Sequence, residues 1–299
     1  MKKNLKVIFH CDDFGHNFGF TKTIAEIYRA RGIVSSASIT VNGTAYEYAK
    51  TIYRKEMKGL GLGLHINITD GKAMTVSLAD SQGNYKRRFQ HYFFEICVLG
   101  NRKLLSMIER DIEKQFVKAL VTDRLPIDHV NGHDHIHLIS GISEIVIKLA
   151  RKYRVKNIRI PKEPYFLVGE WKHDLAPFLN KNLIKFMLLN FFAGRMIKIA
   201  KKAGFYASGC VYGVLHTDHM DSIVIRACLK DAIKKNMGLI EIISHPAVKD
   251  TQDKEYTSDF FRWYTTKKTR VIEKKALLSL ELRDFINRHG VRLVSYRSR

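Results

Sequence analysis

The chain has 299 residues, 45% hydrophobic and 27% charged, so it can bury a large core and has neither a disordered nor a fibrous composition. Its 51 Lys and Arg against 29 Asp and Glu give a formal net charge of +22, which favours an anionic partner, although a lysine-rich proteome would give the same excess. Four cysteines without a Cys-x-x-Cys pair exclude a disulfide scaffold and indicate a reducing compartment.

The N-terminal apolar run is short and Lys6 interrupts it, unlike the apolar region of a signal peptide. No segment approaches the ~20 apolar residues of a membrane span. We therefore expect a cytoplasmic protein.

Strand and helix periodicities alternate along the first half of the chain. Gly32 and the pair Asn42-Gly43 mark the ends of elements. In chain order we predict a strand at 5–9, a helix at 20–31, a strand at 33–41, a helix at 45–55, a strand at 61–68, a helix at 95–120 and a strand at 127–130. Residues 70–92 lack periodicity, which predicts a long loop of the kind that often forms a substrate lid.

The second half continues the alternation. We predict a helix at 141–153, a strand at 157–160, a strand at 239–243, a helix at 276–288 and a last strand at 291–295. Because there is no linker, repeat or change of composition, residues 1–299 are expected to form a single domain. Alternating strands and helices predict an α/β fold with a parallel sheet or barrel.

Polar clusters lie at or near the ends of four predicted strands. They follow Phe9, include His65, and follow Val130 and Ile243. In a (β/α) barrel the carboxyl ends of the strands meet on one rim, so these clusters are expected to converge there.

Asp12 and Asp13 are adjacent at the first of these ends. Their side chains point to opposite sides of an extended backbone, so one can bind a metal while the other acts as an acid or base. A turn with an Asx cap would explain an isolated pair equally simply.

The stretch H-V-N-G-H-D-H-I-H holds four histidines, namely His129, His133, His135 and His137. In an extended segment His133, His135 and His137 would share a face. Neutral imidazole is the commonest metal ligand and pairs naturally with carboxylate, so we interpret this run as part of a metal site.

Three further residues are ambiguous on their own. His65 would more often be a core histidine, and His245, before Pro246, a turn histidine. Glu241 is either a buried carboxylate that supports the site or a solvent-facing residue of an edge strand. Together with the aspartates they suit a hydrolase, because a metal lowers the pKa of bound water from ~15.7 toward ~7 while a carboxylate and an imidazole move protons.

The strings H-C-D-D-F-G, G-L-G-L-H-I-N-I-T-D-G, H-V-N-G-H-D-H-I-H, N-I-R-I-P and I-I-S-H-P resemble, in this order, the YdjC-like carbohydrate deacetylases, which include chitooligosaccharide deacetylases and hopanoid-associated relatives. The resemblance runs over residues 5–296. It implies a distorted (β/α) TIM-like barrel in a single domain, and an enzyme that removes N-acetyl groups from amino sugars.

The resemblance also implies roles for individual residues. Asp13, His65 and His133 would bind one divalent metal, Asp12 would be the general base, and His245 is the candidate general acid. Residues expected to contact the substrate or support the site are Asn42, His135, His137, Arg159 (near the sugar at the rim) and Glu241. Two nitrogen ligands and one oxygen favour zinc, with magnesium as the alternative.

The chain departs from the family pattern at three positions. Asn131 stands where the family often has Asp, and an amide orients a neighbouring histidine less strongly than a carboxylate, so the basicity of the ligating histidine is expected to differ, while the effect on metal affinity stays open. His10 and Cys11 replace the more usual Asn and Ala.

Residues 181–202 contain six basic residues and no acidic one, interleaved with apolar residues at roughly helical spacing. An ordinary barrel helix with a solvated face would show this pattern. A helix lying on an anionic membrane would also show it. The second interpretation suits an N-acetylhexosamine linked to a lipid phosphate at the inner face of the membrane, as an alternative to a chitooligosaccharide.

Two other functions compete with deacetylation. Metal-dependent phosphoesterases or amidohydrolases on a similar barrel usually resemble one another in a His-x-His motif on the first strand, where this chain has Asp12 and Asp13. A nucleic-acid binder would fit the charge and the aromatic and basic residues at 85–94, but it has no use for clustered histidines and paired aspartates. We therefore expect no nucleic-acid partner.

Overall fold

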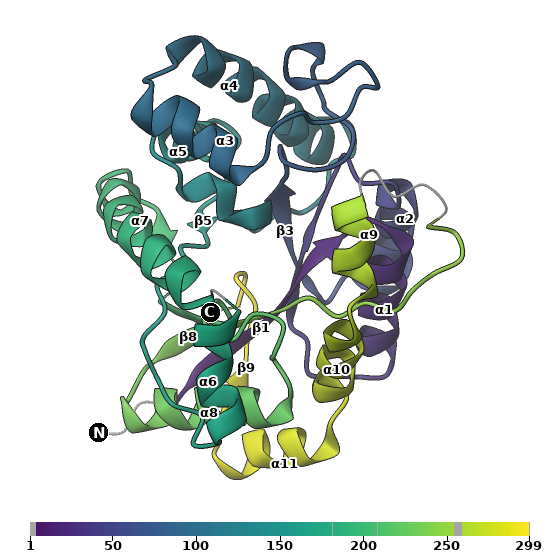
Figure 1. Ribbon diagram of the computed structural model, residues 1–299. Coiled ribbons are helices and arrows are strands. Elements are labelled where there is room, and N and C mark those ends of the chain that lie inside the picture. The colour runs from purple at the N-terminus through teal and green to yellow at the C-terminus, as the bar shows by residue number, and fades with distance from the viewer. Residues whose placement is uncertain (1–3, 181, 208, 254–258, 299) are drawn as a thin grey trace.

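A curled parallel sheet organises the chain (Figure 1). The computed structural model describes residues 4–180, 182–207, 209–253 and 259–298. Within them the sheet order is β6-β5-β4-β3-β2-β1-β8-β7, and β9 pairs with the start of β1. The strands are β1 (Lys6–Phe14), β2 (Ser36–Ile39), β3 (Gly61–Ile66), β4 (His129–Gly132), β5 (Asn157–Ile158), β6 (Tyr206–Ala207), β7 (Cys210–Tyr212), β8 (Leu239–Ser244) and β9 (Arg292–Leu293).

Helices and short helical turns fill the connections. They are α1 (Phe18–Arg29), α2 (Tyr46–Glu56), η1 (Val76–Leu78), α3 (Phe89–Phe93), η2 (Phe94–Val98), α4 (Arg102–Phe116), η3 (Val117–Thr122), η4 (His133–Leu138), α5 (Ile142–Lys152), α6 (Trp171–Leu179), α7 (Asn182–Lys202), α8 (Ser222–Lys234), α9 (Asp259–Thr266), α10 (Lys268–Leu277) and α11 (Leu280–Arg288). No helix of the described ranges is long and apolar enough to cross a membrane.

The two edge strands of the sheet, β6 and β7, are close neighbours in the sequence. The sheet therefore has to curl until its edges approach each other, and the backbone N–H of Val211 in β7 donates to the carbonyl of Lys162, just after β5, at 3.1 Å. The α/β class and the parallel sheet are confirmed. The sheet forms a half-barrel, and no β6–β7 ladder closes it among the residues described, so the full TIM-like barrel is not seen.

Strand parity divides the sheet into an apolar and a polar face. In β1, Val7, Phe9 and Cys11 belong to the main hydrophobic core, whereas Ile8 packs in a separate cluster. Because successive side chains alternate, His10 and Asp12 lie on the same side as Ile8. The same alternation holds in the neighbouring strands, where apolar residues face the helices and the polar residues between them face the inside of the curl. The inside-facing polar residues are Ser36, Ser38, His65, His129, Asn131, Asn157, Arg159 and Glu241.

Several predicted boundaries need correction. The first strand extends to Phe14 and so contains Asp12 and Asp13. The second strand, predicted at 33–41, is shorter and covers only Ser36–Ile39. The helix predicted at 276–288 is broken between α10 and α11, because the Ser279 side chain accepts a hydrogen bond from Leu282 N and caps a new helix. Residues 70–92 are not a structureless loop. They contain η1, the start of α3 and two antiparallel bridges, Lys72–Asn84 and Ala79–Tyr85.

Candidate active site

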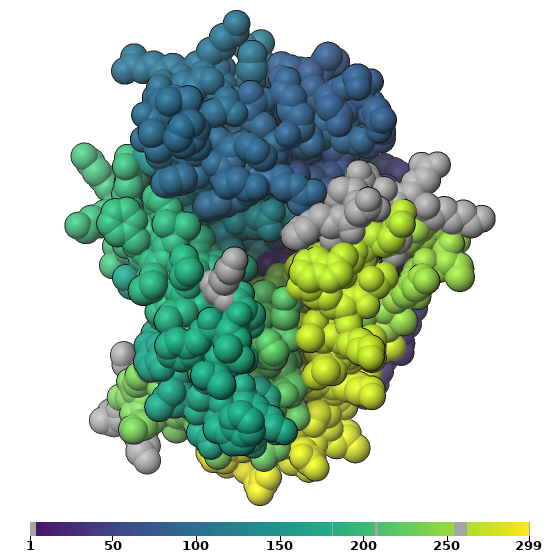
Figure 2. Space-filling model, viewed as in Figure 1, coloured from purple at the N-terminus to yellow at the C-terminus, as the bar shows by residue number. Residues whose placement is uncertain are grey.

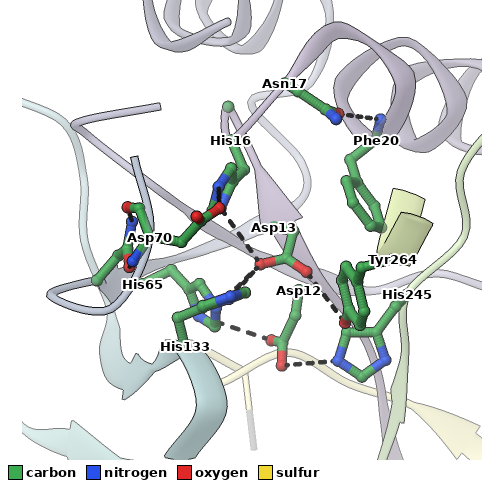
Figure 3. Close-up of polar contacts among 12 residues, drawn as sticks. Asp12, Asp13, His16, Asn17, Phe20, His65, Asp70, His133, His245 and Tyr264 are labelled. Atoms are coloured by element: carbon green, nitrogen blue, oxygen red, sulfur yellow. Dashed lines mark hydrogen bonds and ion pairs between the residues drawn. The ribbon is translucent and has the colours of Figure 1, made fainter. Parts of the chain in front are cut away.

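The predicted polar clusters do converge. Figure 2 shows a hollow in the viewed face, bordered by the blue, green and yellow parts of the chain. Figure 3 shows the side chains of Asp12, Asp13, His65, His133 and His245 directed toward one another. All five are buried or nearly so. They come from β1, β3, η4 and the end of β8, which parallel pairing holds side by side.

Asp13 is the centre of the histidine cluster. Its backbone has φ 66°, in the left-handed region, so the strand turns here and the carboxylate leaves the regular alternation. Its Oδ1 lies 2.9 Å from His133 Nδ1 and 3.3 Å from His65 Nε2, and Tyr264 donates to its Oδ2 at 3.5 Å (Figure 3). Burial would raise the pKa of Asp13, but His133 and His65 outweigh it and hold that pKa well below its usual range.

His65 is oriented by two neighbours on the adjacent strands. Its Nδ1 lies 2.9 Å from Asn131 Oδ1 and 3.1 Å from Ser38 Oγ. An amide oxygen can only accept, so Nδ1 carries the proton and Nε2 presents a lone pair toward Asp13. That Nε2 is buried and has no hydrogen-bond partner among the described residues. A buried nitrogen in this state suits a metal ligand, since the opposite ring nitrogen is held as ligating histidines usually are.

His16 also joins the cluster, although no motif had assigned it a role. Its Nε2 lies 3.3 Å from Asp70 Oδ2 and its Nδ1 lies 3.8 Å from Asp13 Oδ1. One potential ligand atom each from Asp13, His16 and His133 lie within 4.8 Å of one another. His16 follows Asp13 by three residues, and the turn at Gly15 (φ 85°) lies between them. This spacing is the signal in the sequence that could have indicated His16.

Asp12 sits on the polar inner face, and because Asp13 leaves the regular alternation, the two carboxylates reach the same histidine instead of pointing to opposite sides: His65 Nδ1 lies 4.0 Å from Asp12 Oδ1 and His65 Nε2 lies 3.3 Å from Asp13 Oδ1. Its Oδ1 accepts hydrogen bonds from Ser38 at 3.0 Å and Asn131 at 2.9 Å, and Arg159 Nη1 donates to both carboxylate oxygens at 2.8 and 2.7 Å. Burial would raise the pKa of Asp12, but Arg159 and the neighbouring histidines outweigh it and hold the pKa well below its usual range. Asp12 is therefore ionised at any physiological pH.

Arg159 lies fully buried beneath Asp12, with 0% of its surface exposed, and not at the rim near a sugar. Its other guanidinium nitrogens, Nε and Nη2, each lie 2.7 Å from Glu241 Oε1. Glu241 also accepts a hydrogen bond from Tyr296, which settles its orientation as buried. The guanidinium thus bridges two buried carboxylates and fixes the position of Asp12.

The histidine run does not form the expected extended face. Residues from His133 onward form η4, in which Asp134 (φ 52°) and His135 (φ 56°) are left-handed, so the three histidines point in different directions. His137 Nε2 bonds the carbonyl of Arg159 at 2.9 Å, and burial lowers its pKa to about 3. His129 stacks on Tyr296 at 4.0 Å between ring centroids, away from Asp13.

The ring of His135 lies 6.4 Å from that of His137, measured between their centroids. Burial, and then the charge of Lys185 in α7, hold its pKa well below the usual value, so the ring is neutral. His135 belongs to η4, which packs against α7. Asn42 is committed elsewhere as well, because its amide donates to the carbonyls of Asn67 and Lys72 and to the Tyr85 hydroxyl at 3.3, 3.0 and 3.2 Å. It ties the segment after β2 to residues 67–85, and within the described residues it makes no hydrogen bond to the aspartates or histidines of the cluster.

His245 Nε2 lies 3.6 Å from Asp12 Oδ2. Burial, followed by the positive charge of Arg270, lowers the His245 pKa to about 4, so the imidazole is neutral at rest. Its backbone N–H donates to Glu273, which pairs with Arg270 at 3.1 Å. Tyr264, Arg270 and Glu273 also lie here, but they come from α9 and α10 and carry no local motif that would predict them.

A cavity of about 970 Å³ lies away from this cluster. It is at the amino ends of the strands, among Lys6, Asp128, Lys156 and Leu239, and none of the residues of the candidate site line it. The chemistry therefore belongs to the opposite, carboxyl end of the sheet, as expected for an α/β enzyme.

Known proteins resemble this chain in sequence and in fold. The sequence model of the family described as "YdjC-like protein" matches residues 6–288. A carbohydrate deacetylase of Brevibacillus brevis is 26% identical over 301 residues, which cover 98% of each chain, and one of Xenopus laevis is 22% identical over 308 residues, which cover 98% of this chain and 97% of the relative. The crystal structure of an Enterococcus faecalis protein, proposed to cleave cellobiose phosphate, superposes with a TM-score of 0.72 at 18% identity over 99% of this chain and 98% of its own. On the match to its family model, which spans nearly all of its length, the chain belongs to the YdjC-like protein family.

Proposed function

We propose that this protein is a metal-dependent carbohydrate deacetylase that hydrolyses the acetamide of an N-acetylated amino sugar. The observation that carries the proposal is the pair Asp12 and Asp13. One carboxylate is locked by Arg159 and directed toward His245, and its neighbour is surrounded by histidines. The curated relatives that match along nearly the whole chain are named carbohydrate deacetylases.

The donor set suits one divalent cation. We propose Asp13, His65 and His133 as ligands, because the free Nε2 of His65 and the Nδ1 of His133 both face the same carboxylate oxygen. His16 is the candidate for a further ligand. Two or three imidazoles and one carboxylate match zinc better than magnesium, which prefers oxygen ligands. Such a cation would polarise the acetyl carbonyl and lower the pKa of the attacking water.

Asp12 is suited to be the general base. Its Oδ1 accepts hydrogen bonds from Ser38, Asn131 and Arg159, whereas its Oδ2 faces His245 and accepts, among the described residues, a hydrogen bond from Arg159 only. As the water oxygen bonds to the carbonyl carbon, Asp12 Oδ2 accepts a water proton. The fixed geometry is the main contribution, because a carboxylate held by four hydrogen bonds needs no reorientation before it reacts.

His245 then acts as the general acid. Its low pKa means that it holds no proton at rest, so it must receive one during the reaction. Asp12 Oδ2 is 3.6 Å away and can pass on the proton taken from water. The imidazolium donates it to the amide nitrogen as the C–N bond breaks, releasing the free amine and acetic acid, which ionises. An imidazolium with a low pKa is a strong acid and favours protonation of a poor leaving group.

Acetate release tests this function. The substrates are an N-acetylated chitooligosaccharide and a polyprenyl-phosphate-linked N-acetylhexosamine, each with and without a chelator. We expect chelator-sensitive release that Asp12→Asn lowers by about 10³-fold or more without loss of metal, and that His133→Ala abolishes together with metal binding. Matched exposed controls are Asp284→Asn and His289→Ala, which should retain full activity.

Metal content of the same variants tests the ligand set. His65→Ala should weaken zinc binding more than His16→Ala does, and the reverse order would replace His65 by His16 in the proposed site. Release of phosphate but not acetate from a phosphorylated amino sugar would instead support the phosphoesterase alternative.

A further inference from the structure

Two consecutive helices beside the hollow expose apolar faces to solvent. Of the residues of α6, Trp171, Leu175 and Phe178 follow a spacing of four and three residues, so they share one face, and Leu179 adjoins it. Their side chains are all exposed, Trp171 to 72%. An amphipathic helix normally turns such a stripe toward the core, and here the buried residues of α6 are Ala176 and Pro177.

Helix α7 repeats the pattern and adds positive charge. Its buried face carries Leu189, Phe192, Ala193, Met196 and Ala200. Its exposed side carries a second stripe at spacings of three and four residues, apolar in the first half of the helix and basic in the second. The residues of this stripe are Ile184, Met187, Leu188, Phe191, Arg195, Lys198 and Lys202. Phe191 is 76% exposed.

The charges of this stripe are nearly uncompensated. Helix α7 contains no acidic residue, and of its exposed basic residues only Arg195 has a carboxylate partner in the described ranges, Glu144 at 3.0 Å. Lys181, at the start of the basic stretch found in the sequence, lies outside the described residues. The remaining cations and the chain's net charge of +22 select an anionic partner, while the apolar stripe selects one that also accepts hydrocarbon.

The exposed apolar surface continues beyond the two helices. The exposed side chains include Phe94 and Val98 of η2 and Leu99, which follows η2. A cavity of about 500 Å³ lies between η2 and α7, and the residues that line it include Cys97, Phe191 and Arg195. Figure 2 shows α6 and α7 as adjoining teal and green regions at the border of the hollow. Contiguous exposed apolar surface of this kind marks an interaction site.

We propose that α6 and α7 dock the protein on an anionic lipid bilayer. We call the residues Trp171, Leu175, Phe178 and Leu179 of α6 and the stripe of α7 the α6–α7 surface. Its apolar part would enter the interface between headgroups and acyl chains, and Arg195, Lys198 and Lys202 would contact lipid phosphates. The tryptophan fits the same environment, because its ring has an apolar body and a polar N–H.

Docking in this way places the candidate active site at the membrane. Helix α7 packs against η4, which carries His133 and His135, and the Asn182 side chain at its start donates to the carbonyl of Thr217 at 2.8 Å. The candidate site therefore lies on the buried side of α7, one helix away from the proposed lipid surface. If the proposed deacetylase activity holds, the substrate class is an N-acetylated sugar anchored in the bilayer by a lipid, and this consequence rests on the proposed function.

Vesicle flotation tests the docking without reference to activity. The protein is mixed with vesicles of phosphatidylcholine alone, or with about one-third phosphatidylglycerol, at low and high salt. We expect the protein to float with the anionic vesicles only, and high salt to weaken binding by about tenfold or more. Phe178→Ser/Phe191→Ser and, separately, Lys198→Glu/Lys202→Glu should each reduce the bound fraction by about tenfold or more.

The matched control is Lys230→Glu/Lys234→Glu, which makes the same change of charge on exposed positions of α8 and should bind like the wild type. Circular dichroism and release of acetate from a soluble chitooligosaccharide show that each variant is folded, because none of the substituted residues belongs to the candidate site. Equal loss of binding in the α8 control would overturn the proposal, since only net charge would then matter. The proposal would also be overturned if the wild type did not bind anionic vesicles. This would hold whether or not light scattering showed a dimer that Phe178→Ser/Phe191→Ser dissociates.

Loss of vesicle binding with retained activity on the soluble sugar would leave the deacetylase intact and remove only the docking. Vesicle binding by a protein that releases acetate from no substrate would do the opposite. The two proposals therefore fail separately.

Discussion

Asn131 connects two parts of the candidate site, the proposed metal ligand His65 and the proposed general base Asp12. The sequence comparison suggested that an amide here would orient its histidine less strongly than the family's usual Asp. The structure shows what the amide adds, because its oxygen accepts from His65 while its nitrogen donates to Asp12 at 2.9 Å and Ser38 at 3.0 Å. A carboxylate could not donate to Asp12 and would repel it.

Arg159 should be the residue whose loss harms stability most clearly. Arg159→Met would leave the carboxylates of Asp12 and Glu241 buried without their shared cation, which costs about 3–5 kcal/mol of unfolding free energy. Urea denaturation measures it. The double variant Arg159→Met/Glu241→Gln should recover part of the loss, because only one buried charge remains unpaired. If the double variant were less stable than the single one, the guanidinium would not be compensating Glu241.

Metal affinity should rise with pH. Burial would lower the pKa of His133, but the carboxylates of Asp13 and Asp134 outweigh it and raise the pKa to about 10. A ligating imidazole must give up that proton, so a metal competes with it between pH 6 and pH 9, and the dissociation constant should fall by up to about tenfold per pH unit. Zinc titrations monitored by calorimetry in buffers of different ionisation enthalpy would count the proton. Affinity independent of pH would exclude His133 as a ligand.

At the scale of elements, strand parity was accessible from the sequence and helix η4 was not. The alternation in G-L-G-L-H-I predicted β3 and the position of His65, and strand ends located four of the polar clusters. The three alternate histidines, however, do not share a face, because the left-handed residues Asp134 and His135 fold them into a turn that no periodicity reveals. Tyr264, Arg270 and Glu273 reach the site from α9 and α10 by tertiary packing, which a single sequence does not encode locally.

Gly63 sets the spacing of the two strands that carry His65 and Asn131. It pairs with His129, and a Cβ at Gly63 would lie 2.3–2.7 Å from three atoms of that imidazole, which is itself packed against Tyr296. We expect Gly63→Ala to push β3 and β4 apart, lowering the unfolding free energy by about 1–3 kcal/mol and weakening zinc binding. Denaturation and zinc titration of one preparation measure both effects.

The matched control for this substitution is Gly194→Ala in α7. A Cβ there meets nothing nearer than the flexible Lys162 Nζ at 4.0 Å, so the added methyl should stabilise the helix by about 0.5–1 kcal/mol. Opposite signs for one and the same chemical change would attribute the Gly63 effect to strand spacing. A neutral Gly63→Ala would mean that the His129 ring moves aside at no cost.

For the whole molecule, the alternation of strands and helices predicted the α/β fold and its parallel sheet, and the half-barrel is consistent with the predicted distorted barrel, although full closure is not seen among the described residues. Closure depends on how β6 and β7, only two and three residues long, meet at the sheet edges, and segments so short carry almost no periodicity. The sequence also left the meaning of the basic stretch open. Its decisive property, exposure of the apolar as well as the basic residues, appears only when the other side of α7 is seen packed on the core.

The net charge of +22 should make folding dependent on salt. Like charges on a compact surface repel one another, and the expanded chain relieves this repulsion, so screening stabilises the folded state. At about 10 mM salt the screening length is roughly 30 Å, and it shortens to about 8 Å at physiological ionic strength. We expect the unfolding free energy to rise by on the order of 1 kcal/mol over this range, or about 2–4 °C in Tm. Scanning calorimetry in NaCl measures it, and Lys230→Glu/Lys234→Glu, which removes four charges from the excess, should show a smaller rise. Destabilisation by salt would mean instead that the ion pairs of the surface outweigh its repulsions, and that the excess cations are already spaced widely enough to be harmless.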